Sequence, residues 1–122
     1  ARKKQLLPEH LEAVGIQPGT NYVIEGAEDD GRCPEFENLW YAPVRPDPPQ
    51  ANYEKAERDF LKVCVEFYEQ YPNMGAMMLE CTGMQPFARA VQREIDIPVF
   101  SWGTLLDYAY SVVVHRDYYG HV

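Results

Sequence analysis

Cysteine is scarce in this sequence of 122 residues. Cys33, Cys64 and Cys81 are its only cysteines, they lie at irregular spacing, and no Cys-x-x-Cys motif is present. An odd number of irregularly spaced cysteines predicts neither a disulfide framework nor a thiol zinc site. The three histidines also lack metal-ligand spacing. We therefore expect no metal and no cofactor, and a reducing cytoplasmic setting.

Long hydrophobic runs are missing as well. No apolar stretch approaches the ~20 residues that a helix needs to span a bilayer. The start, Ala-Arg-Lys-Lys-Gln, lacks the hydrophobic region of a signal peptide. We expect no membrane association, and the absence of an initial Met fits a processed product or a fragment.

Basic residues are outnumbered, with 11 Lys and Arg against 19 Asp and Glu and a net charge of -8. This charge repels a phosphate backbone, so nucleic-acid binding is disfavoured. Residues 21 to 60 carry about -6 of the total and are expected to form a solvated acidic face. No serine-triad motif, phosphate loop or dinucleotide fingerprint is present, which disfavours those enzyme classes.

Hydrophobic residues make up 46 % of the chain and charged residues 25 %, as in ordinary globular proteins. A chain of this length is long enough for one domain and too short for two ordinary ones. We therefore expect a single α/β domain over residues 1–122.

The first half of the chain predicts a helix, a strand and a long loop. A helix is expected over Leu6 to Ile16, with Pro8 in its first turn, and a strand over Tyr22 to Ile24. Residues 27–50 are rich in acid, proline and glycine, so they are expected to form a long Pro-rich loop. This loop is either a plain surface connection or a lid over a binding site.

The second half gives stronger helix signals. Asn52 is expected to cap a helix from Tyr53 to Gln70 that carries Cys64 in its apolar stripe, as a small core residue. The continuous apolar run at Ala76 to Leu79 predicts a strand covered on both faces. A helix, a strand and a final helix follow, over residues 86–94, 97–100 and 103–115.

This order predicts an α/β fold with a small parallel sheet flanked by helices and right-handed crossovers. Three strands are few for such a sheet, where ~5 to 6 are typical. We therefore expect the sheet to be incomplete and to be completed by a homo-oligomer partner or by a missing N-terminal lobe.

Cys81 is the candidate catalytic residue. It follows the apolar run in Gly75-Ala-Met-Met-Leu-Glu-Cys-Thr-Gly-Met-Gln-Pro86, and ligands of parallel sheets bind beyond the carboxyl ends of the strands. A helix starting near Pro86 would favour a thiolate there, and Thr82 and Gly83 would present backbone N–H groups to a carboxylate or enolate. A buried, inert cysteine is the alternative interpretation of the same spacing.

The same stretch, followed by Ile97-Pro-Val-Phe-Ser-Trp-Gly-Thr-Leu-Leu106, resembles the C-terminal half of aspartate/glutamate/hydantoin racemase superfamily proteins. The resemblance extends to residues 6–16 and 72–76, and so covers most of the chain outside 27–50. Its most specific part is the Glu-Cys-Thr motif at residues 80–82 in its strand-turn-helix context.

The resemblance implies one lobe of a two-lobed, cofactor-independent racemase, in which one thiolate removes a proton and a second thiol returns one from the opposite face. Cys81 would be one of these thiols, with Thr82 on the carboxylate of a small carboxylate or amino-acid-like substrate. Neither Cys33 nor Cys64 has the strand-end setting of a second thiol, and Gly83 stands where racemases of this group often carry a histidine. The alternatives are a one-cysteine decarboxylase or cis-trans isomerase relative, and a non-catalytic racemase-like domain that binds a small acid.

Overall fold

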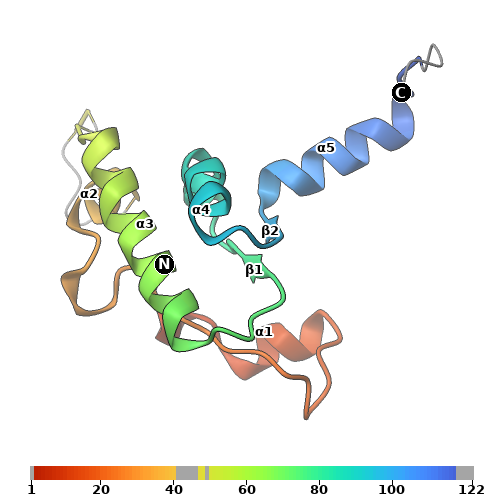
Figure 1. Ribbon diagram of the computed structural model, residues 1–122, viewed down its shortest axis with the longest axis horizontal. Coiled ribbons are helices and arrows are strands. Elements are labelled where there is room, and N and C mark those ends of the chain that lie inside the picture. Colours follow the sequence, from red (N-terminus) through yellow and green to blue (C-terminus); the bar gives the residue numbers. More distant parts are fainter. Residues whose placement is uncertain (1, 41–46, 49, 118–122) are drawn as a thin grey trace. The chain divides into compact units, whose positions relative to one another are not determined.

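The computed structural model describes residues 2–40, 47–48 and 50–117 (Figure 1). The chain divides into two compact units, Ala1–Pro72 and Asn73–Val122. The described part combines helices with a small two-stranded parallel sheet, so the expected small α/β fold is confirmed. Each unit is described by itself below.

The first unit begins with the short 3-10 helix η1, Lys3–Gln5, and the helix α1, Pro8–Ala13. Pro8 occupies the first turn of α1, as the sequence predicts, because its missing N–H would have no partner there. The strand predicted at residues 22–24 is wrong. Tyr22 and Val23 are exposed and belong to no regular element, since a β-branched run forms a strand only where another strand pairs with it.

The long loop predicted over residues 27–50 is also wrong in part, because it contains the 3-10 helix η2, Asp29–Gly31, and the helix α2, Pro34–Trp40. Pro34 opens α2 and Glu35 lies in its first turn, where a carboxylate favours the helix macrodipole. Phe36 and Leu39 of α2 are buried. Residues 41–46 and 49 of the predicted loop lie outside the described residues.

The longest helix is α3, Tyr53–Gln70, with the predicted bounds. The side chain of Asn52 caps it by accepting a hydrogen bond of 2.9 Å from the backbone N–H of Lys55. Its buried stripe contains Ala56, Phe60, Val63 and Cys64, which confirms Cys64 as a core residue. The core of this unit lies between α3 and α2, where the rings of Phe60 and Phe36 stack at 6.0 Å.

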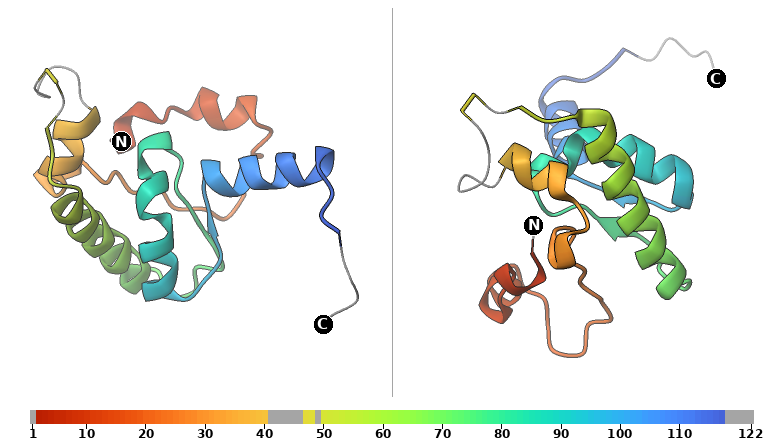
Figure 2. Two further views of the ribbon diagram at one scale, coloured as in Figure 1. Left: turned by 90° about the horizontal axis from the view of Figure 1, so that it is seen from above. Right: turned by 90° about the vertical axis from the view of Figure 1, so that its left-hand side faces the viewer.

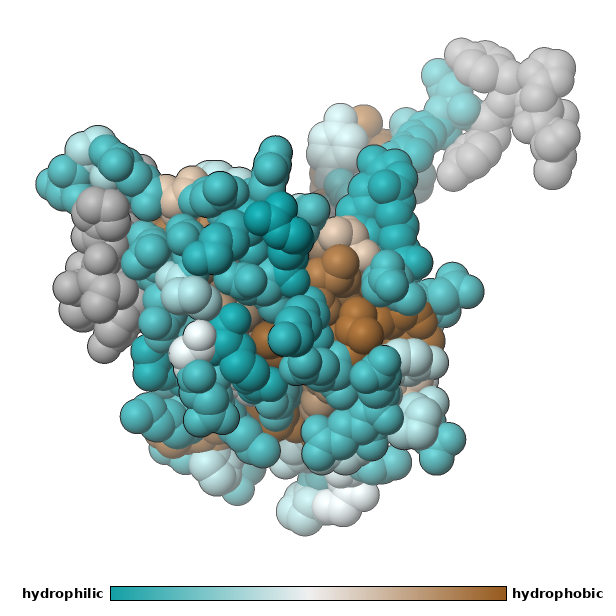
Figure 3. Space-filling model, turned by 60° about the vertical axis from the view of Figure 1, so that its left-hand side comes forward, coloured by the Kyte–Doolittle hydropathy of each residue, from teal (hydrophilic) through white to brown (hydrophobic). Residues whose placement is uncertain are grey.

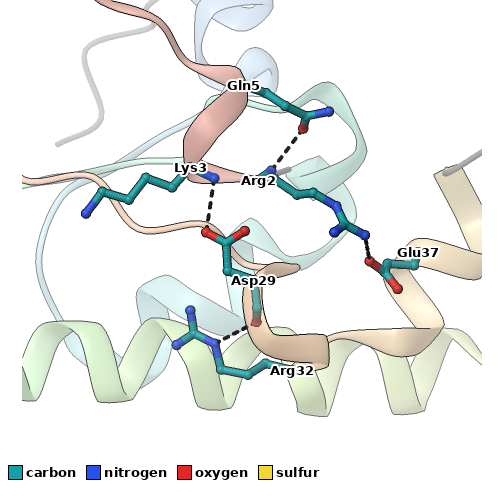
Figure 4. A network of polar contacts seen from close by, with 6 residues as sticks. All are labelled: Arg2, Lys3, Gln5, Asp29, Arg32 and Glu37. Carbon is teal, nitrogen blue, oxygen red and sulfur yellow. Dashed lines mark hydrogen bonds and ion pairs between the residues drawn. The ribbon is translucent and has the colours of Figure 1, made fainter.

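A polar network ties the start of the first unit to the turn before α2 (Figure 4). The backbone N–H of Lys3 donates to Asp29 at 3.2 Å, and the guanidinium of Arg2 pairs with Glu37. Arg32 donates to the carbonyl of Gly26 at 2.9 Å and pairs with Glu25. The bonds of Arg2 and Lys3 join the start of the chain to residues 29–37, and the bonds of Arg32 hold the turn at residues 25–32 together.

The second unit is built around the parallel strands β1, Met77–Met78, and β2, Val99–Phe100. The backbone N–H of Met77 donates to Pro98 at 2.9 Å, and that of Leu79 donates to Phe100 at 2.8 Å. Between the strands the chain forms the 3-10 helix η3, Thr82–Phe87, and the helix α4, Ala88–Ile95. This is the expected strand-helix-strand arrangement with parallel strands (Figure 2).

The sheet is covered on one face only, which corrects the expectation for residues 76–79. Met77 and Leu79 are buried, whereas Met78 is 73 % exposed. Phe100, the partner of Met78 across the sheet, is also exposed. Alternate residues of a strand point to opposite faces, so the face that carries Met78 and Phe100 is uncovered.

The final helix, α5, runs from Trp102 to Val113 and none of its residues is buried. It extends away from the rest of its unit in Figure 1 and in the left-hand view of Figure 2. Several large hydrophobic side chains are exposed, and the face shown in Figure 3 has hydrophobic areas within a mostly hydrophilic surface. Among the described residues, no helix combines the length and the apolar character that a membrane span requires.

Candidate functional site

Cys81 lies at the carboxyl end of β1, two residues beyond the buried Leu79. Its backbone is extended, with φ -78° and ψ 133°, and it forms the N-cap of η3. The backbone N–H of Met84 donates to the Cys81 carbonyl at 3.0 Å, which closes the turn after the strand. Cys81 is partly exposed, unlike the other two cysteines, which are buried.

The two predicted substrate-binding residues follow Cys81 directly. Thr82 is the first residue of η3 and is exposed, whereas Gly83 is buried. The α-helix expected to begin near Pro86 begins at Ala88, because η3 intervenes and contains Pro86. The positive end of α4 is therefore several residues away from the thiol, and the turn of η3 is what lies beside it.

The start of α5 is bonded to the turn that carries Cys81. The indole N–H of Trp102 donates to the carbonyl of Glu80 at 3.1 Å. The backbone N–H of Gly103 donates to the side-chain oxygen of Gln85 at 2.8 Å. A β-carbon at Gly103 would lie 2.1 Å from the Gln85 amide, so a larger residue there would require the Gln85 side chain to move.

Ser101 connects β2 to α5 and is buried. Its side chain accepts from the Thr104 N–H at 3.5 Å, and the Thr104 hydroxyl accepts from the Ser101 N–H at 2.9 Å. This reciprocal capping fixes the direction of α5 at its first turn. The carboxyl ends of both strands thus meet in one hydrogen-bonded region that contains Glu80, Cys81, Ser101 and Trp102.

The other two thiols have a different environment. Cys33 and Cys64 are buried in the first unit. Burial raises the pKa of Cys33 to about 11, with the charge of Asp59 adding to it. Burial likewise raises the pKa of Cys64 to about 12, with a smaller contribution from Cys33. Both side chains are therefore neutral core thiols at neutral pH, and neither is a candidate acid or base.

A shallow depression of about 510 Å³ is lined by residues near the amino end of β2, among them Asp96, Ile97 and Pro98. Cys81 lies at the opposite end of the parallel pair and does not line it. Within the described ranges, no three His, Cys, Asp or Glu side chains gather into a group that could hold a metal ion.

Gln85, Ser101, Trp102 and Gly103 are the residues around Cys81 that the sequence did not predict. Their contacts with residues 80–85 join positions about twenty residues apart, and no local pattern reports such pairs. Only the Ser-Trp-Gly-Thr run after the third predicted strand carries a local signal, because Ser followed three residues later by Thr fits an N-cap.

Comparison of the chain with protein-family models, with curated proteins and with solved structures finds no match.

Proposed function

We propose that this protein is a racemase-like enzyme, or part of one, that moves a proton at the carbon next to a carboxylate or carbonyl without a cofactor. The proposal rests on the resemblance of residues 75–86 and 97–106 to the Asp/Glu/hydantoin racemase superfamily and on the position of Cys81. Its proposed setting is a reducing cytoplasm, which agrees with three free cysteines.

One observation carries the proposal. Cys81 is the partly exposed cysteine, it follows the carboxyl end of a strand in a parallel pair, and its backbone belongs to the turn into η3. Parallel sheets bind small ligands at this end. The hydrogen bonds from Trp102 and Gly103 to the neighbouring turn would help to keep Cys81 in position during a proton transfer.

In the proposed reaction, the Cys81 thiolate takes the proton from the α-carbon and becomes a thiol, while the electron pair moves into an enolate of the adjacent carboxylate or carbonyl. Return of a proton from the opposite face by a second acid inverts the centre. Thr82 is exposed beside Cys81 and is the proposed contact for the carboxylate. This substrate role of Thr82, like that of Gly83, stays a prediction.

A specific observation favours a second candidate. The other thiols of this chain, Cys33 and Cys64, are buried in the core of the first unit, so neither is open to a substrate as the second acid. Unless another chain or lobe supplies that acid, Cys81 would act alone, as in a one-cysteine decarboxylase of malonate-like acids or an isomerase of unsaturated diacids.

The two candidates are separated by incubating the protein in D₂O with two substrate panels. The first panel contains enantiopure amino acids and hydantoins, and the second contains malonate-like and unsaturated diacids. Deuterium entering the α-position of the first panel supports racemase chemistry, whereas loss of CO₂ or a change of double-bond geometry in the second supports the one-cysteine reaction. Activity of Cys81→Ala that equals the activity of the matched control Cys64→Ala would refute both.

A further inference from the structure

Cys33 and Cys64 are two nucleophilic side chains that the proposed function does not use. Cys33 directly precedes α2, and its carbonyl accepts a hydrogen bond of 3.1 Å from the N–H of Glu37 in that helix. Cys64 lies in the buried stripe of α3. Their exposed fractions are 0 % and 5 %, so both thiols lie within the core of the first unit.

The contact between α2 and α3 brings the two cysteines to the same part of this core. The rings of Phe36 and Phe60 stack across the contact at 6.0 Å, with 15° between their planes. Cys33 precedes Phe36 by three residues, and Cys64 follows Phe60 by four. Residues three or four apart are neighbours on one face of a helix, so each cysteine lies about one turn from a ring of the stacked pair.

The electrostatic interactions of Cys33 point to the same segment of α3. Burial is the main cause of the raised pKa of Cys33, and the charge of Asp59 adds to it. Burial is also the main cause of the raised pKa of Cys64, and Cys33 adds to it. Interactions between charges weaken with distance, so Cys33 lies beside the part of α3 that carries Asp59 and Cys64.

The pair lacks the further ligands that a metal site needs. In the part of the chain that the structure describes, no group of three or more His, Cys, Asp or Glu side chains could hold a metal ion. Both cysteines are free thiols. Besides packing as small apolar residues, two thiols on facing helices can be oxidised to a disulfide.

We propose that Cys33 and Cys64 are a reversible redox pair, which a low-molecular-weight disulfide converts into a bond that joins the start of α2 to α3. In the first step, one cysteine thiolate attacks a sulfur of the small disulfide and releases a small thiolate, which takes up the proton that the cysteine lost. In the second step, the other cysteine thiolate attacks the mixed disulfide and releases the second small thiol. The protein loses two hydrogen atoms and the small disulfide gains them. This inference does not depend on the proposed chemistry at Cys81.

Burial of the two thiols makes this exchange depend on local opening of the core. Only the thiolate attacks, and burial disfavours the thiolate at both sites. The helix α2 has seven residues, of which only Phe36 and Leu39 are buried, and short elements with few buried contacts open at low cost. Opening of α2 exposes Cys33 to the small disulfide, and closing returns it to Cys64. The bond then closes the loop between residues 33 and 64, which restricts the unfolded chain and stabilises the first unit.

The test is the equilibrium of the full chain with mixtures of reduced and oxidised glutathione, in buffer and in concentrated urea. Cys81→Ala removes the third thiol. Acid quenching, alkylation and mass spectrometry of the peptides give the fraction of chains with a Cys33–Cys64 bond. The equilibrium constant for the bond should be at least ~30-fold larger in buffer than in urea, because the fold holds the pair together and a flexible chain does not.

Equilibrium is approached from the reduced chain and from a chain that is oxidised in urea and then refolded. A constant in buffer that is no larger than in urea overturns the proposal, and so does an oxidised chain that fails to refold, because the fold then keeps the thiols apart. The urea midpoint of the oxidised chain should also exceed that of the reduced chain, and a lower midpoint overturns the proposal.

The matched control combines Ala56→Cys with Cys64→Ala, which moves the buried thiol about two turns along the same stripe of α3. Circular dichroism checks that this variant folds. The control should form the bond to Cys33 no more readily in buffer than in urea. An increase in buffer as large as that of the Cys33 and Cys64 pair overturns the proposal, because any buried cysteine of α3 would then serve.

Discussion

Native-state alkylation should distinguish the buried thiols of Cys33 and Cys64 from the partly exposed Cys81. At pH 8 a thiol with the ordinary pKa of 9.0 is about one-tenth thiolate. With a pKa of about 11, Cys33 is about one-thousandth thiolate, which is a 100-fold reduction. With a pKa of about 12, Cys64 is reduced about 1000-fold. Because only the thiolate reacts, folding should slow alkylation of the two cysteines by at least these factors.

The assay is a time course with iodoacetamide at pH 8, in buffer and in urea, followed by mass spectrometry of the three cysteine peptides. The ratio of native to unfolded rate at each site removes differences in intrinsic reactivity. Cys81, which is partly exposed, should retain a ratio more than about tenfold above those of Cys33 and Cys64. The reasoning is refuted if Cys33 or Cys64 reacts in the folded chain within tenfold of its unfolded rate, or if Cys81 is as protected as they are.

Three further predictions concern the first unit. Asn52→Ala removes the side-chain cap of α3 and should lower the free energy of unfolding by about 1 kcal/mol in urea titrations; no loss would contradict the cap. Gly26→Ala places a β-carbon 2.4 Å from the backbone nitrogen of Lys3 and should lower the free energy of unfolding by about 1–3 kcal/mol. The control Gly75→Ala, in the second unit, has open space around it and should be nearly neutral. Equal effects of the two substitutions would contradict the close packing at Gly26. Hydrogen bonds from the backbone of Asn52 and the side chain of Lys55 lower the pKa of Glu35 below its ordinary 4.5. The contribution of Glu35 to the free energy of unfolding is therefore present above pH 4.5 and is lost as the pH falls further. The stability difference between wild type and Glu35→Gln should therefore shrink in acid, and a difference that is independent of pH would exclude this linkage.

The parts of the fold that the sequence predicts are those with local signals. The helix α3 carries a cap at Asn52 and a regular apolar stripe, and both of its bounds are as predicted. The helix α2 was missed because the acidic, proline-rich composition of its surroundings suggested a loop. Its own signals, Pro34 at the first position and Glu35 in the first turn, are those of a helix start.

Burial was harder to predict than secondary structure. Met78 lies in a continuous apolar run and was expected to be covered, yet it is exposed. Leu105 and Val112, apolar residues of the predicted final helix, are exposed too. A pattern shows which residues share a face, but what covers that face depends on non-local contacts and on partners.

In the candidate site, too, the sequence predicted local features but not contacts between distant segments. Cys81 was found because a strand, a polar residue and a turn follow each other in the chain. The bonds from Trp102 to Glu80 and from Gly103 to Gln85, which hold that turn against α5, join separate segments and left no local trace.

The central claim is that the Cys81 thiol transfers a proton at a carbon next to a carboxylate or carbonyl. The most direct measurement is the rate of deuterium incorporation from D₂O into enantiopure amino acids and hydantoins, by wild type and by Cys81→Ala, with Cys64→Ala as the matched control. The account predicts exchange with at least one compound for wild type and Cys64→Ala, and none for Cys81→Ala. Exchange that continues at the wild-type rate in Cys81→Ala would contradict it.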